Sequence, residues 1–123
     1  MVKTATIIFG IFFLVAGLAG FSAALAPEGK LFGLFMVGAV HNIIHIASGI
    51  AAFMCAFVGL AASRVYLRSF GIIYGLIAVL GVFYGDHALL GIVQHNLNDI
   101  WLHILIAAVA LYLGFATRDN VPS

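Results

Sequence analysis

The chain has 123 residues, of which 65% are hydrophobic, and only 7% are charged. Soluble domains carry about 25% charged residues, so this composition excludes a globular protein that covers its apolar surface in water. The formal net charge is +1, and the absence of a basic cluster argues against nucleic-acid binding. The length suits one domain, residues 1–123, with the lipid bilayer as its solvent.

Four apolar stretches follow one another along the chain, and we expect each of them to cross the bilayer as a helix. They cover roughly residues 5–26, 40–62, 69–85 and 100–117. A helix needs about 20 residues to cross about 30 Å of hydrocarbon. Lipid offers no hydrogen-bond partners, so a single span must pair its own backbone groups. The sequence therefore predicts an all-α integral membrane protein built as a four-helix bundle.

The first stretch also has features of a secretory signal. Lys3 precedes an apolar run that ends in the small residues Ser22–Ala26. Pro27 directly follows the best cleavage site and disfavours cutting there. We therefore expect this stretch to be kept as the first span.

The positions of the basic residues predict the orientation of the spans. Lys3 precedes the first span, Arg64 and Arg68 lie between the second and the third, and Arg118 follows the fourth. The opposite side carries only Lys30. Since Lys and Arg gather on the cytoplasmic side, both termini are expected in the cytoplasm and the other two connections outside.

The two halves of the chain resemble each other. Residues 10–14 (GIFFL) match residues 71–76 (GIIYGL), and each segment leads to an apolar stretch and then to a His-Asn pair, at His41 and at His95. In this alignment His45 matches Asp99. The repeat predicts two helical hairpins related by an axis along the membrane normal. The second and fourth spans would then begin at the same depth.

The stretches that precede the second and fourth spans, Leu31–Val40 and Ala88–Gln94, are more apolar than ordinary loops. We interpret both as short segments that lie in the membrane interface. An alternative is that the second helix extends back to Leu31, which would give a helix of about 45 Å that must tilt strongly or protrude.

Histidines and one aspartate are concentrated where the even-numbered spans begin. His41 and His45 are four residues apart, and so are His95, Asp99 and His103 in turn, so each set forms a stripe on one helix face. Imidazole with a carboxylate suits zinc or iron, and imidazole alone also suits copper. Three amides stand near these ligands and could orient the rings by hydrogen bonds: Asn42, Asn96 and Asn98.

This pattern predicts a transition-metal site for sensing, storage or transfer of an ion, without an enzymatic role. The main alternative is a structural or accessory subunit of a larger membrane complex, in which the same side chains form helix caps and interhelical hydrogen bonds. Assembly of the isolated chain into a homo-oligomer is a separate expectation and would count against this alternative. Two further hypotheses are a bis-histidine haem held by His45 and His103, and a hydrolase that uses a zinc-bound water. His87 is expected in a solvated loop.

Two motifs carry a family resemblance. One is His41-Asn42-x-x-His45 followed by Gly49, and the other is Asn96-x-x-Asp99-x-x-x-His103. With them, nearly the whole chain resembles a bacterial family of small four-span membrane proteins that is catalogued as a domain of unknown function. The resemblance implies a four-helix membrane domain and a bacterial origin. For a helical multi-pass protein of bacterial origin we expect the inner membrane as its location. It implies no activity and no catalytic residues.

Overall fold

The fold is a bundle of four long helices, seen in a computed structural model that describes residues 1–85, 87–93 and 95–117. The elements in chain order are α1 (Val2–Ala19), the 3-10 turn η1 (Pro27–Gly29), β1 (Lys30–Leu31), β2 (Phe35–Met36), α2 (Ala39–Val58), α3 (Leu60–Tyr84), α4 (Leu97–Leu111) and the π-helix η2 (Tyr112–Ala116). Helices α1, α2, α3 and the continuous unit of α4 with η2 are each long and apolar enough to cross a membrane. The predicted all-α membrane bundle is thereby confirmed.

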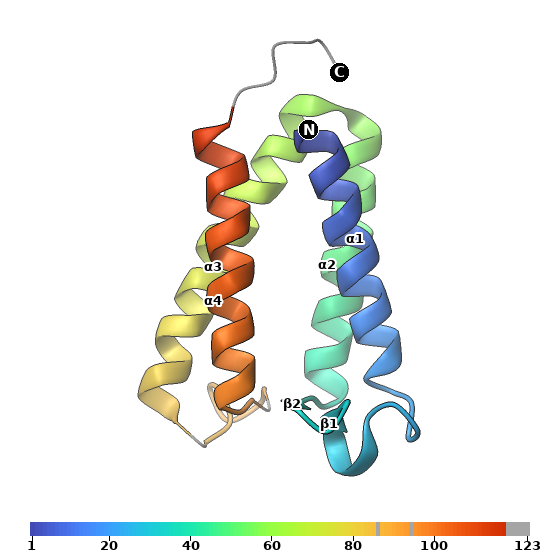
Figure 1. Ribbon diagram of the computed structural model, residues 1–123, viewed down its shortest axis with the longest axis vertical. Helices are drawn as coiled ribbons and strands as arrows, with labels where there is room; N and C mark the ends of the chain where they lie inside the picture. Colours follow the sequence, from blue (N-terminus) through green and yellow to red (C-terminus); the bar gives the residue numbers. More distant parts are fainter. Residues whose placement is uncertain (86, 94, 118–123) are drawn as a thin grey trace.

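The helices pair as two hairpins. Helix α1 packs along α2, and α3 packs along α4, as the repeat predicts (Figure 1). The N-terminus, the junction of α2 with α3 and the end of η2 lie at one end of the bundle, whereas β1 and β2 lie at the opposite end. Helices α2 and α4 therefore run in the same direction, and both begin at the end that carries the strands.

The bundle exposes apolar side chains and buries polar ones. Phe57, Val58 and Phe83 are 94%, 77% and 82% exposed. Among the described residues, nine polar or charged ones are buried instead: Thr6, His41, Asn42, His45, Ser48, Ser63, His95, Asp99 and His103. This distribution is the one expected where lipid surrounds the protein and polar groups must find partners inside.

Two predicted span boundaries are wrong. Helix α1 ends at Ala19 rather than near residue 26, and α3 begins at Leu60 rather than near residue 69. The break before α3 is a single residue, Gly59, whose φ of 145° is a conformation that side-chain-bearing residues rarely adopt. Arg64 and Arg68 therefore lie within a helix, and not between two spans as predicted.

These two arginines remain at the end of the bundle because they bind the last carbonyls of the fourth span. Arg64 Nη1 donates to the oxygens of Gly114 and Thr117, at 3.1 and 2.9 Å. Arg68 Nε donates to the Gly114 oxygen at 2.7 Å. Carbonyls at a helix end lack partners within the helix and attract cations. Arg118, the remaining basic residue predicted on this side, lies outside the described residues.

The connections before α2 and α4 contain the same tight turn. Phe32 and Gly33 have φ values of 54° and 73°, and Leu90 and Gly91 have 52° and 75°. The same backbone hydrogen bond between residues three apart closes each turn, from Gly33 N to Lys30 O at 2.9 Å and from Gly91 N to Ala88 O at 3.0 Å. The extension of the second helix back to Leu31 is wrong, since a β-hairpin occupies that stretch. Gln94, the end of the second stretch, lies outside the described residues.

Close approach of α1 to α2 depends on glycine, which leads to a first prediction. A Cβ at position 49 would lie 2.8 Å from Leu14 N and 2.9 Å from Gly10 O, both backbone atoms of α1. Gly49→Ala is expected to lower the free energy of unfolding by about 1–3 kcal/mol, because the helices must separate. Denaturant titration of the protein in detergent measures this change.

Gly75→Ala is the matched control, since a Cβ there meets only the Ala107 Cβ at 3.8 Å. Alanine stabilises helices by up to about 1 kcal/mol relative to glycine, so this variant should keep or exceed the stability of the original chain. Equal effects of the two substitutions would contradict the close contact at Gly49.

Candidate metal centre

Helix α2 places two imidazoles side by side close to its N-terminal end. His41 and His45 are one helical turn apart, and their Nε2 atoms lie 3.1 Å apart, at hydrogen-bond distance. One ring therefore donates to the other within the same helix. Their side chains are buried, with 3% and 6% of their surface exposed.

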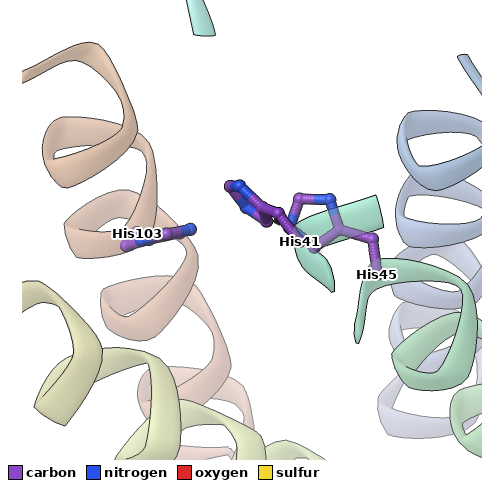
Figure 2. Close-up of side chains that lie close together, drawn as sticks. All are labelled: His41, His45 and His103. Carbon is purple, nitrogen blue, oxygen red and sulfur yellow. Dashed lines mark hydrogen bonds between the residues drawn. The ribbon is translucent and has the colours of Figure 1, made fainter. Parts of the chain in front are cut away.

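His103 approaches this pair from the other hairpin. It projects from α4 and is 4% exposed. Figure 2 shows its ring directed from α4 toward the rings of His41 and His45. One ligand nitrogen from each of the three rings can be chosen so that all lie within 4.8 Å of one another. We call His41, His45 and His103 the histidine triad.

Two stacked aromatic rings cover the triad on its inner side. The Phe13 and Tyr74 rings lie 5.2 Å apart with an interplanar angle of 20°. The Phe13 ring lies 5.5 Å from that of His45, and the Tyr74 ring 5.3 Å from that of His103. Phe13 and Tyr74 were not among the residues predicted for the site. The repeat could have indicated it, because Gly10–Phe13 aligns with Gly71–Tyr74 and so makes Phe13 and Tyr74 equivalent.

Asp99, predicted as a ligand, is held by backbone groups. Its Oδ2 accepts from Asn96 N at 2.8 Å and from Met36 N at 3.0 Å, and Asn96 Oδ1 accepts from Asp99 N at 3.1 Å. The reciprocal bonds with Asn96 form a capping box at the start of α4. The bond to Met36 ties that helix to β2. Asp99 lies outside the triad.

The three amides predicted to orient the ligands have other contacts. The Nδ2 atoms of Asn96 and Asn98 both donate to the Leu34 oxygen at 2.9 Å, in the turn between β1 and β2. Asn42 packs against Gly20 at the end of α1, and its Oδ1 has no hydrogen-bond partner in the described part of the chain. Asn96 and Asn98, like Asp99, join the two hairpins.

His95, the fifth predicted ligand, is buried beside the triad. It is 2% exposed, and within the described ranges neither of its ring nitrogens has a hydrogen-bond partner. It lies near Gly81 of α3 and interacts electrostatically with His103. The structure does not include it in the triad. His87 is exposed, as expected, while its neighbour Asp86 lies outside the described residues.

Comparison with known proteins identifies a family and no function. The family model of a domain of unknown function, DUF4383, matches residues 3–116. No curated protein and no solved structure matches the chain. The triad must therefore be interpreted from its own chemistry.

Proposed function

Because this chain belongs to the DUF4383 family, which carries no assigned activity, we propose from the site itself that the protein binds a transition-metal ion at the histidine triad. The observation that carries the proposal is the convergence of three buried imidazoles, from two different hairpins, to within 4.8 Å. The proposed role is sensing, storage or transfer of the ion, without catalysis.

The spacing of the triad suits one ion after a contraction. Metal-to-nitrogen bonds of histidine are about 2.0–2.1 Å, so two nitrogens on one tetrahedral ion are about 3.3 Å apart. The Nε2 atoms of His41 and His45 are already close to this separation, at 3.1 Å. The widest separation, within 4.8 Å, needs a contraction of up to about 1.5 Å. Zinc, ferrous iron and copper all accept imidazole ligands.

His95 is our candidate for a fourth ligand. It is buried, and both of its ring nitrogens are without a partner in the part of the chain that the structure describes. A buried polar group without a partner is costly, at about 1–3 kcal/mol, and a metal bond would remove that cost. A His95 nitrogen bound to the same ion would give the four-coordinate site that zinc prefers.

The accessory-subunit hypothesis accounts well for the aspartate and the asparagines. It accounts less well for the histidine triad. Asp99, Asn96 and Asn98 link the first hairpin to the second. The hydrogen bond between His41 and His45 lies within one helix and joins no helices. A stoichiometric partner that co-purifies with a metal-free protein would favour this alternative.

Haem is less well supported than a bare ion. A haem iron bound by His45 and His103 needs the porphyrin ring between the two imidazoles. The His41 ring lies 4.4 Å from that of His45 and 5.9 Å from that of His103, between centroids, so it competes for the space. A hydrolase would need a base beside the zinc-bound water, and the Oδ2 of Asp99 is already bound to two backbone amides.

Metal analysis of the purified protein tests the proposal. After loading with Zn²⁺, Fe²⁺ or Cu²⁺ and removal of excess ion, we expect one ion per chain by elemental analysis. His95→Ala should retain the ion with about 10–100-fold lower affinity if His95 completes the site, a range typical for the loss of a supporting group. Wild-type protein that takes up none of the three metals would refute the proposal.

We place the chain in the bacterial inner membrane with both termini in the cytoplasm. Lys3 and the bound pair Arg64 and Arg68 lie at one end of the bundle, and Lys30 at the other. The triad is then nearer the outer face. Leu90→Cys in a Cys55→Ser background should react with an impermeant thiol reagent added to intact cells, and labelling only after lysis would reverse this orientation.

A further inference from the structure

A cavity of about 510 Å³ lies between α1, the connection that carries β1 and β2, and α4. Helix α1 contributes Phe12, Val15 and Ala16, and the connection contributes Leu31 and Phe35. Its size falls in the range of about 300–1,000 Å³ that is typical of pockets for small molecules. Lipid surrounds the bundle, so the ligands that can reach this cavity are those that dissolve in the membrane.

Two polar side chains interrupt the apolar wall of the cavity, His45 and Asp99. His45 is 6% exposed, and its Nδ1 has no hydrogen-bond partner in the described part of the chain. Its Nε2 faces His41 on the other side of the ring. When His41 donates to His45 Nε2, the remaining hydrogen of the His45 ring is on Nδ1, so that atom is a donor without an acceptor.

We infer that this cavity binds a neutral, membrane-soluble molecule with an apolar body and one carbonyl group, of the quinone type. The carbonyl oxygen accepts a hydrogen bond from His45 Nδ1, and the body lies against α1 and the connection. A plain alkyl chain would leave the buried Nδ1 unpaired, which is unfavourable. A phosphate headgroup would have to be buried among apolar walls without a positively charged partner among the lining residues that the structure describes.

This inference does not depend on the metal proposal. The carbonyl contacts Nδ1 of His45, whereas an ion would bind through the nitrogens of the triad. An ion on His45 Nε2 would also fix the hydrogen on Nδ1, so the two ligands are compatible. His103 is absent from the cavity lining, which provides a variant that separates the two sites.

The experiment uses the full chain, freed of metal with a chelator, in lipid nanodiscs. Thermal unfolding is followed during titration with a decyl-substituted benzoquinone and, in parallel, with dodecane, which has a similar apolar tail and no carbonyl. A ligand that binds only the folded state raises the unfolding temperature according to its affinity. We expect the quinone to bind about tenfold more tightly than dodecane, the ratio that one hydrogen bond of about 1.4 kcal/mol provides.

Three variants complete the test. His45→Phe keeps a ring of similar size and should reduce the quinone affinity to that of dodecane, while His103→Ala should keep the original ratio. Ala16→Phe fills the cavity and should abolish binding of both compounds, and its helical circular dichroism shows whether it has folded. Equal affinities for quinone and dodecane in the original chain would overturn the inference, and so would binding of neither compound.

Discussion

Replacing His103 with alanine is expected to lower the affinity of the protein for Zn²⁺ by at least about 100-fold, since even supporting groups around a metal contribute 10–100-fold. Within the triad, His103 is the proposed ligand from the second hairpin, and His41 and His45 both come from α2. The variant keeps two imidazoles one turn apart and loses the one that closes the site. Competition with a chromophoric chelator measures the affinity.

His87→Ala provides the matched control for this substitution. His87 is exposed and lies in the connection between α3 and α4, so its loss removes an imidazole without changing the triad. We expect its Zn²⁺ affinity to equal that of the original chain. If His103→Ala binds Zn²⁺ as tightly as His87→Ala does, the triad is not the metal site.

The same substitution also separates the metal hypothesis from the packing hypothesis. His103 is buried against Tyr74, at a centroid distance of 5.3 Å, so its truncation removes packing as well as a ligand. His103→Phe retains the ring and the packing. We expect His103→Phe to keep the stability of the apo protein and to lose Zn²⁺ binding as fully as His103→Ala, a combination that packing alone does not produce.

The fold could be predicted from the sequence because lipid imposes strong and simple constraints. Length and hydropathy indicate the four spans, and the matched halves indicate the pairing into two hairpins. The predicted start of the third span, near residue 69, was wrong because the hydropathy of a segment falls wherever it contains an arginine, and such a fall resembles the end of a span. The structure shows that the side chains of Arg64 and Arg68 reach the carbonyls at the end of the fourth span while their backbones stay helical.

The candidate site could be predicted only in part. The spacing of four residues indicates which side chains share a helix face, but it does not show which members of two stripes on different helices approach one another. In the aligned repeat His103 corresponds to Gly49, so the triad is asymmetric, although His45 and His103 are each the seventh residue of their own helix. Asn96 and Asp99 had a local explanation, since their spacing is that of a capping box.

Asp99→Ala is expected to lower the free energy of unfolding by about 2–4 kcal/mol, because it leaves the amides of Asn96 and Met36 without their acceptor. Asp99 is 2% exposed, so water cannot easily replace the carboxylate. The substitution also removes one of the bonds that hold β2 against α4. Denaturant titration in detergent measures the loss, with wild-type protein as the reference.

Asp99→Asn tests whether this residue is a cap or a metal ligand. Its amide oxygen can accept both backbone hydrogen bonds, so we expect it to recover most of the stability that Asp99→Ala loses. An amide is a far weaker ligand than a carboxylate for the metals that suit this site. Unchanged Zn²⁺ affinity in a stable Asp99→Asn protein would assign the residue to the joint between the hairpins. A loss of Zn²⁺ affinity as large as that of His103→Ala would instead assign Asp99 to the metal site, because Asp99→Asn keeps the helix cap and removes only the carboxylate.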